Sequence, residues 1–414
     1  MVAILTRIFG SEHLGLAEDV VQDTLGRALQ TWPYHGIPEN PAAWIMRAAR
    51  NRALDVIRRD RVFQDKEAEV IRRMEDSQSA ATRPDTEPTA VADDRLRLML
   101  VCCHPQIPED AQAALALRTL CGFSVTEISR AFLTSEAAVA KRLTRARQKI
   151  REARIPFEIP EGENLQDRVE GVRRTLYLLF NEGYKASQGE RLVREEICHE
   201  AIRLTTLLAE HPVGRQPATE ALLALMLLSA ARFPARLDAS GRLLRLNEQD
   251  RSRWEAAKIS QGLFHLMRSA SGNVISEYHL QAGIAACHTA APNYDSTDWR
   301  QILSLYDQLV RLDPSPVVAL NRAVVVGNVH GAAAGLAAVE AIPQRRKLDD
   351  YYLLYAVLGE LESQLGRHEV AVRHFRRSLQ LAELRSEQTF LQRRLDDSES
   401  YLESADLMVP RRTS

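Results

Sequence analysis

The chain has 414 residues, of which 45% are hydrophobic and 26% charged, and its formal net charge at pH 7 is −1. Because one small core does not organise so long a chain, about two to four domains are expected. The near-zero charge excludes a uniformly basic nucleic-acid-binding protein, so such binding would need local basic patches. There is no run of about 18 apolar residues and no basic-then-apolar leader at Met1, which predicts a cytoplasmic protein without membrane contact.

The cysteines indicate a reducing compartment and no metal centre. There are five, none of them in a C-x-x-C pair: Cys102, Cys103, Cys121, Cys198 and Cys287. Two are followed by histidine, but neither Cys-His pair has a second pair at zinc-finger spacing. We therefore interpret all five as buried free thiols and expect neither a metal nor a cofactor.

Apolar residues recur at helical spacing almost everywhere, and no convincing period-two run appears, which predicts an all-α protein. Polar stretches with proline and glycine divide the chain. The predicted segments are a first helical block at 1–64, a linker at 65–94, a second helical block at 95–154, a helical extension at 165–290 and helical repeats at 291–406.

The first block begins with a short helix, Val2–Phe9, and continues with a longer helix at Leu16–Gln30. Apolar spacing on the longer helix predicts a buried stripe of Val21, Leu25, Ala28 and Leu29. The other side is expected to be exposed and acidic, at Glu18, Asp19, Gln22 and Asp23. Such a face complements a basic protein surface, although on most proteins it is only solvated.

A loop rich in proline, Trp32–Pro41, leads into a helix expected from about Ala42 to Asp60. The predicted core stripe of this helix is Ile45, Ala48, Ala49, Ala53, Val56 and Ile57. Its opposite side gathers Arg47, Arg50, Asn51, Arg58 and Arg61. Residues 44–61 carry six bases and two acids, a local net charge of +4. A basic helix beside an aromatic loop is typical of a site for single-stranded nucleic acid.

Residues 65–94 are polar, contain Pro84 and Pro88, and carry nine acids against four bases. Such a composition cannot bury enough apolar surface to fold by itself. It therefore predicts a flexible acidic linker between the two helical blocks.

The most specific pattern lies at 122–151, GFSVTEISRAFLTSEAAVAKRLTRARQKIR. Ser124 and Glu127 form a predicted capping box for a short helix, and Ser135 is placed to cap a second helix after a tight turn. The short helix is expected to bury Val125, Ile128 and Phe132, and the second helix Val139, Leu143, Ala146 and Ile150. The exposed face of the second helix then presents Ala140, Lys141, Thr144, Arg145 and Gln148.

Residues 133–154 carry seven bases and two acids, a local net charge of +5. A short helix, a tight turn and a longer basic helix are typical of a helix-turn-helix, whose second helix enters the major groove. The alternative is an amphipathic hairpin with a solvated basic face. Capping, turn length and charge placement all favour the helix-turn-helix.

The last hundred residues contain a loose repeat of about 34 residues. Six residues occupy the small and large positions of a helical hairpin repeat: Leu358, Gly359, Gly366, Ala371, Phe375 and Ser378. Three upstream residues match the end of a preceding unit: Tyr306, Leu309 and Pro314. This pattern predicts tetratricopeptide-like hairpins. An ordinary helical bundle with similar spacing is the alternative.

Three segments resemble regions 2 and 4 of extracytoplasmic-function sigma factors: LAEDVVQDTLGRAL, NPAAWIMRAARNRALDVIRR and FSVTEISRAFLTSEAAVAKRLTRARQKIR. The resemblance covers about residues 1–154 and implies a subunit that directs RNA polymerase to promoter DNA, touching the clamp helices and the flap of the core enzyme. Contacts with core polymerase would be made by Asp19, Gln22 and Asp23. The −10 element would be bound by Tyr34, Asn40, Trp44, Arg47, Arg50, Asn51 and Arg58. The −35 element would be bound by Ser135, Ala140, Lys141, Arg142, Thr144, Arg145 and Arg147, with Arg142 and Arg147 on phosphates.

The remainder resembles one branch of these sigma factors, which carries a long C-terminal extension. The similar segments are NEGYKAS (181–187), DRSRW (250–254) and SPVVALNRAVVV (315–326). Members of this branch are often encoded beside small DGPF-motif proteins and lack a membrane-bound anti-sigma partner. The resemblance therefore implies that the extension regulates activity, and it makes a DGPF-type protein a candidate partner.

The chain departs from the family pattern at two places. The usual first helix is shortened to Val2–Phe9, which would make the first block less stable than in relatives unless the true start lies upstream. Ala140 stands where many relatives carry a basic residue, which implies an altered −35 preference.

Two other functions are open at this point. A one-component regulator with a sensor extension would explain 122–151, but neither the acidic face at 18–23 nor the basic helix at 44–61. An enzyme within 165–414 would need a pocket around residues such as Glu182, Tyr184, His199 and His211. No G-x-S-x-G, H-E-x-x-H, Walker A or G-x-G-x-x-G motif is present, so we expect no catalytic activity. For the extension, a regulatory module is favoured over a passive stabilising domain.

Overall fold

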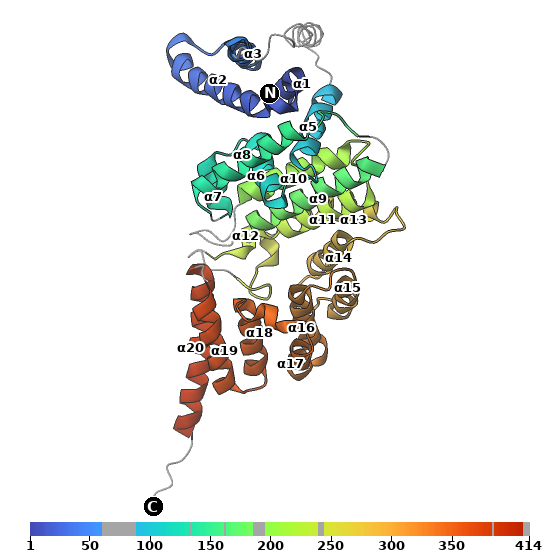
Figure 1. Ribbon diagram of the computed structural model, residues 1–414. Coiled ribbons are helices and arrows are strands. Elements are labelled where there is room, and N and C mark those ends of the chain that lie inside the picture. The colour runs from blue at the N-terminus through green and yellow to red at the C-terminus, as the bar shows by residue number, and fades with distance from the viewer. Residues whose placement is uncertain are drawn as a thin grey trace, which may run out of the picture. The chain divides into compact units, whose positions relative to one another are not determined.

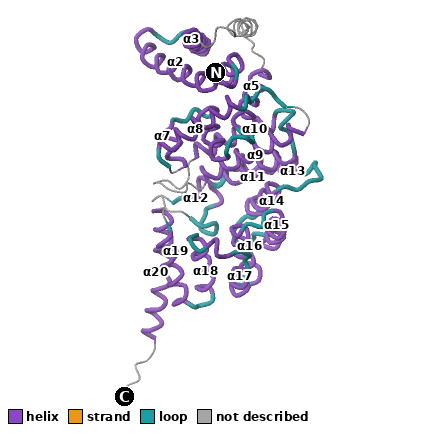
Figure 2. Tube along the Cα trace, viewed as in Figure 1, coloured by secondary structure: helices purple, strands orange, loops and turns teal. Residues whose placement is uncertain are grey.

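The computed structural model describes residues 1–59, 88–132, 134–160, 163–184, 195–238, 244–382 and 385–408. Every regular element within these ranges is a helix, which confirms the predicted all-α class (Figure 2). The chain forms two compact units, one of residues 1–179 with 210–214 and one of residues 180–209 with 215–414. None of the described helices combines the length and the apolar composition needed to cross a bilayer.

The first unit contains the two helical blocks predicted for residues 1–154 (Figure 1). Its helices are α1 (Val2–Phe9), the 3-10 turn η1 (Ser11–His13), α2 (Leu14–His35), α3 (Pro41–Arg59), α5 (Pro88–Cys102), α6 (Glu109–Leu120), α7 (Val125–Phe132), α8 (Glu136–Glu152) and the first part of α9 (Glu163–Tyr184). The shortened first helix is thus present as α1, which packs on α2 and α5.

Helices α1, α2 and α3 form a small core whose buried members are Leu5, Ile8, Phe9, Ala17, Val20, Val21, Ala49, Ala53 and Ile57. The predicted stripe of α2 is partly wrong, because Leu25 is 42% and Leu29 78% exposed. The α2 residues in this core all lie between Ala17 and Val21, so the second half of the helix extends past it. Val56 of α3, predicted to be buried, is also exposed.

The loop between α2 and α3 is shorter than predicted. Helix α2 continues through Pro33 to His35, because the backbone turns only at Gly36, whose φ of 82° favours glycine. The last turn of α2 is held against α3 by Trp32 and Trp44, whose rings meet edge to face at 5.6 Å between centroids.

The second block begins earlier and ends later than predicted. Most of the predicted linker lies outside the described residues, but α5 already starts at Pro88, and proline is favourable at a first helical position. At the other end, α9 packs on this block through Arg168, which donates to the carbonyl of Leu100 at 2.7 Å, and Thr175, which donates to Gln112 Oε1 at 3.0 Å. The first five turns of α9, expected in the extension, therefore belong with the second block.

The cysteines are free thiols, as predicted, but two of them are only half-buried. Cys102, Cys103 and Cys198 are buried, whereas Cys121 and Cys287 have intermediate exposure. Burial raises the pKa of Cys103 to about 11 and also raises the pKa of Cys102 and Cys198. These thiols stay protonated at neutral pH, which does not suit the thiolate chemistry of a metal ligand.

The second unit contains the C-terminal part of α9 and the remaining helices. They are α10 (Glu195–Glu210), α11 (Pro217–Ala230), α12 (Phe233–Arg236), the 3-10 turn η3 (Arg251–Arg253), α13 (Ala256–Ser269), α14 (Glu277–Ala290), α15 (Trp299–Leu312), α16 (Pro316–His330), α17 (Ala332–Glu340), the 3-10 turn η4 (Arg345–Leu348), α18 (Tyr352–Gln364), α19 (His368–Leu381) and α20 (Arg385–Met408). Helix α11 packs against α13 and α14, and from α15 to α20 each helix packs mainly against the helices beside it in the chain.

The hairpin of α18 and α19 shows why the predicted repeat has small and large residues in alternation. Gly359 lies against the ring of the buried Phe375, and a Cβ at position 359 would lie 2.7 Å from Phe375 Cε1. Ala371 faces the same core, and the turn between the helices contains Gly366, whose φ is 73°. Ser378 donates from its hydroxyl to the carbonyl of Tyr352 at 2.8 Å, which ties the two helices together at their other end.

Replacing Gly359 by alanine should destabilise the second unit, whereas the same change at Gly26 should stabilise the first. The added methyl overlaps Phe375 at Gly359, and such overpacking costs about 1–3 kcal/mol. At Gly26, in the middle of α2, nothing lies within 4 Å of a new Cβ, and alanine in a helix is favoured by about 0.5–1 kcal/mol. Urea unfolding of both variants measures the two changes. A stabilising effect at Gly359 would contradict this packing.

Candidate nucleic-acid interface

The helix-turn-helix predicted at 122–151 is formed by α7 and α8. The capping box is present, because the backbone N–H of Glu127 donates to Ser124 Oγ at 3.1 Å and that of Ser124 donates to Glu127 Oε2 at 2.7 Å. Ser135 caps α8 by accepting from the N–H of Ala138 at 3.2 Å. The buried face of α8 is as predicted: Val139, Leu143, Ala146 and Ile150 are at most 3% exposed. On α7, Ile128 is buried, whereas Val125 and Phe132 are half-buried.

The outer face of α8 is exposed at the predicted positions, which are Ala140, Lys141, Thr144, Arg145 and Gln148. Lys141 and Arg145 make no ion pair among the described residues, so both charges are available to a ligand. Arg142 and Arg147, predicted to hold phosphates, each have an acidic partner in this structure: Arg142 Nε lies 3.0 Å from Asp110 Oδ2, and Arg147 contacts Glu18.

Ser135 was predicted both to cap α8 and to touch DNA, and the structure confirms the cap. Ser135→Ala should therefore lower the free energy of unfolding of the second block by about 1 kcal/mol. Ser135→Asp keeps a capping oxygen and should retain this stability, although its negative charge would weaken DNA binding. Thermal unfolding and a DNA-binding assay on both variants separate the two roles. Equal stability of Ser135→Ala and the wild type would contradict the cap.

The basic helix of the first block is α3. Arg47 and Asn51 are exposed one turn apart, and Arg50 is half-buried beside them with no hydrogen-bond partner for its Nε. Arg58 belongs to α3, but its side chain lies outside the described residues, as does Arg61. The helix thus presents a basic face, as predicted from the spacing.

The aromatic and polar residues before α3 have distinct environments. Tyr34 is 86% exposed on the last turn of α2. Trp44 is half-buried against Trp32, a residue that the sequence reasoning did not single out. Asn40 caps α3, because its Oδ1 accepts from the N–H of Ala43 at 3.0 Å. The structure therefore brings Tyr34, Asn40 and Trp44 to the junction of the two helices.

The acidic face of α2 is only partly free. Asp19 is exposed, and Asp23, also exposed, has its Oδ2 3.1 Å from Arg52 Nε of α3. Gln22 Oε1 accepts from Arg118 Nη2 of the second block at 2.6 Å. Glu18, which was expected to be exposed, is 2% exposed.

Glu18 is buried because α2 packs on the second block. Its carboxylate accepts from the hydroxyl of Thr119 and from the guanidinium of Arg147. Gly15, one turn earlier on α2, would place a Cβ 3.4 Å from Arg147 Cδ, so α2 and α8 approach closely here. Glu18 and Gln22 of α2 thus contact Arg147 of α8 and, on the neighbouring helix α6, Arg118 and Thr119. We call this set of contacts the α2–α8 contact.

Two family models match the two blocks. "Sigma-70 region 2" matches residues 1–62, and "Sigma-70, region 4" matches residues 97–150. The chain thus contains regions 2 and 4 of sigma-70 family sigma factors. As a sigma factor, it acts in transcription initiation by binding core RNA polymerase and recognising promoter DNA. The first block is thus region 2, and the second block contains region 4.

The other comparisons concern the extension and the whole chain. A family of unknown function matches residues 168–270. An uncharacterized protein of Rhizobium meliloti (strain 1021), R00370, is 40% identical over 390 residues, which cover 93% of this chain and 90% of the relative. No solved structure matches.

Among the residues that the structure describes, no group of three or more His, Cys, Asp or Glu side chains comes together as potential metal ligands. His199 and Tyr184, considered above for an enzyme pocket, pack around Phe233 instead, with ring centroids 6.4 and 5.8 Å from it. Two features escaped the sequence reasoning, the burial of Glu18 and a cluster of arginines in the extension. Between residues 232 and 254 the sequence has six arginines and three acids, and this excess of basic residues is the signal that could have indicated the cluster.

Proposed function

We propose that this sigma factor is of the extracytoplasmic-function type, reads the −35 element with region 4 and the −10 element with region 2, and is regulated by its own extension. The exposed outer face of α8 is the observation that carries the proposal. It presents two unpaired cations, Lys141 and Arg145, on a capped helix of the kind that enters a major groove.

The contacts proposed for α8 divide by type. Lys141 and Arg145 are suited to acceptors on base edges, since both can donate to guanine O6 and N7. Thr144 donates its hydroxyl to the carbonyl of Ala140 at 2.8 Å, so its methyl group is the part offered to a base, such as the methyl of thymine. Arg142 and Arg147 would turn from their present acidic partners to phosphates.

For the −10 element, the junction of α2 and α3 supports capture of unpaired bases. Tyr34 is almost fully exposed and can stack on a base, while Arg47 and Asn51 supply a phosphate contact and an amide on the same side of α3. Arg50, Arg58, Asn40 and Trp44 complete the proposed site. Asp19, Gln22 and Asp23 remain the residues proposed to contact core polymerase.

The C-terminal half of the chain would then carry regulation in the cytoplasm, with tetratricopeptide-like hairpins as a surface for a partner such as a DGPF-type protein. Support comes from the hairpin packing of Gly359 on Phe375 and from the sequential packing of α15 to α20. Stacked hairpins of this kind present extended surfaces to peptides or domains.

Reconstituted transcription tests the proposal. Purified core polymerase with this protein should initiate at promoters taken from upstream of the protein's own gene, and core polymerase alone should not. A variant ending at residue 179 keeps the part of α9 that packs on region 4, so it tests the extension without exposing that face. Unchanged output from this variant at equal protein level would contradict regulation by the extension. No promoter-dependent stimulation by the full chain would contradict the sigma-factor proposal itself.

A further inference from the structure

Three arginines of the second unit lie close together, and none of them pairs with a carboxylate among the residues that the structure describes. Arg232 precedes α12, Arg236 ends it, and Arg251 begins η3. The guanidinium carbons of Arg232 and Arg251 lie 5.8 and 4.8 Å from the ring centroid of Trp254, so both flank one indole. Arg236 lies over the ring of Tyr184 at 3.9 Å. We call Arg232, Arg236 and Arg251 the arginine cluster.

The arginine cluster joins two of the motifs that were left unexplained above. Tyr184 belongs to NEGYKAS, whereas Arg251 and Trp254 belong to DRSRW. The matched family of unknown function spans residues 168–270 and so includes both motifs and all three arginines. Arg236 lies over the Tyr184 ring and Arg251 over the Trp254 ring, so each motif supplies an aromatic ring to the cluster.

Neutral acceptors orient the cluster but leave its charge uncompensated. Arg251 Nη1 donates to the carbonyl of His288 at 2.6 Å, and Arg236 Nη1 donates to the carbonyl of Tyr184 at 2.8 Å. Arg236 and Trp254 are more than nine-tenths buried. Within the described part of the chain, three buried polar atoms at this cluster have no hydrogen-bond partner: Arg232 Nε, Trp254 Nε1 and His288 Nδ1. Buried donors and charges of this kind are costly unless a partner satisfies them.

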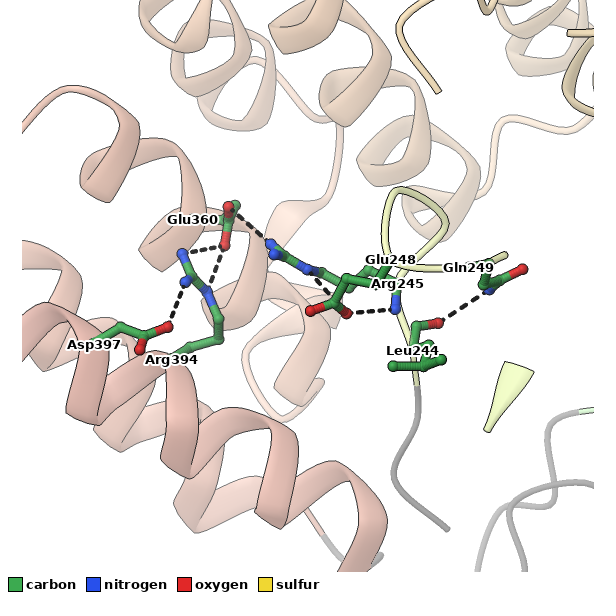
Figure 3. Close-up of polar contacts among 7 residues, drawn as sticks. All are labelled: Leu244, Arg245, Glu248, Gln249, Glu360, Arg394 and Asp397. Atoms are coloured by element: carbon green, nitrogen blue, oxygen red, sulfur yellow. Dashed lines mark hydrogen bonds and ion pairs between the residues drawn. The ribbon is translucent and has the colours of Figure 1, made fainter. Parts of the chain in front are cut away.

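Elsewhere in the same unit, Arg245 and Arg394 form ion pairs with acidic side chains, as Figure 3 shows. Glu360 accepts from Arg394 at 2.9 Å and from Arg245 at 3.4 Å, and Arg394 also contacts Asp397 at 2.9 Å. Arg245 and Glu360 line a cavity of about 380 Å³, so the charges at that cavity are already balanced within the protein. The arginine cluster has no such acids among the described residues.

Two neighbouring groups respond to the uncompensated charge. Burial by itself would raise the pKa of Tyr184, yet the charges of Arg232 and Arg236 bring it below its ordinary value. Burial, together with Arg232 and Arg251, lowers the pKa of His288 to about 4. His288 is therefore neutral at pH 7, and one of its ring nitrogens can donate a hydrogen bond.

We propose that the arginine cluster binds a phosphate group, either as inorganic phosphate or on a small phosphorylated ligand. A phosphate carries nearly two negative charges at neutral pH and several acceptor oxygens, which match several guanidinium groups better than a single carboxylate does. Arg232, whose side chain makes no hydrogen bond to any residue that the structure describes, would be the principal ligand. The indole N–H of Trp254 and the imidazole of His288 are the available neutral donors. This inference concerns the extension and does not depend on promoter recognition.

Isothermal titration calorimetry of the full chain tests the proposal, with chloride used to hold the ionic strength constant. We expect saturable binding of inorganic phosphate or of glucose 6-phosphate, and no comparable binding of acetate. Tighter binding of the sugar phosphate would identify a phosphorylated small molecule as the ligand class. Tighter binding of inorganic phosphate would identify the free anion.

Arg232→Gln should weaken this binding about tenfold to a hundredfold, the usual value of charge-assisted hydrogen bonds. Arg203→Gln is the matched control, because Arg203 is in the same unit but already pairs with Glu200 at 2.7 Å, so its loss should leave phosphate binding unchanged. Without phosphate, Arg232→Gln should unfold at the same temperature as the wild type or higher, because it relieves repulsion in the cluster. Absence of saturable phosphate binding, or equal loss in the two variants, would overturn the proposal.

Discussion

Replacing Arg145 by alanine is expected to reduce discrimination of the −35 element by about 1–3 kcal/mol, which corresponds to roughly 5- to 150-fold in relative promoter binding. Arg145 is exposed on the outer face of α8, has no acidic partner among the described residues, and lies one turn after Lys141. A side chain in this position can donate two hydrogen bonds to one guanine. Competition between a matched and a single-base-substituted −35 element, bound by the polymerase holoenzyme, measures the change.

Arg151→Ala is the control for Arg145. Arg151 is also exposed on α8 but lies on its last turn, so this variant loses the same charge without losing a proposed base contact. It should weaken binding to all sequences alike and reduce the salt dependence, as a phosphate contact does. If Arg145→Ala also weakened matched and mismatched promoters equally, Arg145 would be a phosphate contact and the proposed readout would be wrong.

Glu18→Ala and Asp19→Ala are expected to change core-polymerase affinity in opposite directions, although the two residues are adjacent. Removing one partner of a buried ion pair costs about 3–5 kcal/mol. Because Arg147 keeps about a quarter of its side chain exposed, we expect roughly 2–4 kcal/mol for the α2–α8 contact. Glu18→Ala should therefore open this contact and tighten binding to core polymerase. Asp19→Ala should weaken binding, since Asp19 is already exposed and is proposed to touch the polymerase.

Glu18→Ala is expected to tighten polymerase binding because the α2–α8 contact cannot persist when both promoter elements are bound. By their positions, the −35 and −10 elements lie about 25 base pairs apart, which is roughly 85 Å of duplex at about 3.4 Å per base pair. In the structure, Glu18 of region 2 and Arg147 of region 4 touch directly, so the two regions have to separate before both elements are read. Apparent affinity falls with the fraction of molecules in the competent state, and opening the contact raises that fraction.

The affinity of each full-length variant for immobilised core polymerase tests whether Glu18→Ala binds more tightly and Asp19→Ala more weakly than the wild type. Glu18→Gln serves as a second variant, because it keeps a hydrogen bond to Thr119 while removing the charge, and it should have an intermediate effect. Weaker binding by both Glu18→Ala and Asp19→Ala would mean that Glu18 is itself a polymerase contact. The α2–α8 contact would then have no inhibitory effect.

The sequence predicted region 4 well because its signals are local. In α8 the cap, the buried face and the exposed face all follow from residue spacing within one helix. Ser135 caps the helix, Val139 is buried and Arg145 is exposed, as the helical period predicted. The repeat near the C-terminus was visible for a similar reason, since Gly359 and Phe375 belong to adjacent helices of one hairpin.

What the sequence did not reveal depends on contacts between distant segments. Glu18 has the spacing of an exposed acid on α2, and only the packing of α2 on the second block buries it beside Arg147. Leu29 has the spacing of a core residue, but the helices that pack on α2 do not cover it. The arginine cluster draws its members from α12 and η3, so no single helical period could have indicated it.

The sequential packing of α15 to α20 also determines how this part of the chain comes apart. In an array where each helix depends mainly on its chain neighbours, stability is close to a sum of nearest-neighbour interactions, and the end helix has a partner on one side only. Unfolding should then begin at α20, and hydrogen exchange should be fastest there and slow progressively toward α15. Such an array can lose its last helices while the remainder stays folded, so the C-terminal end can vary in length without loss of the preceding hairpins.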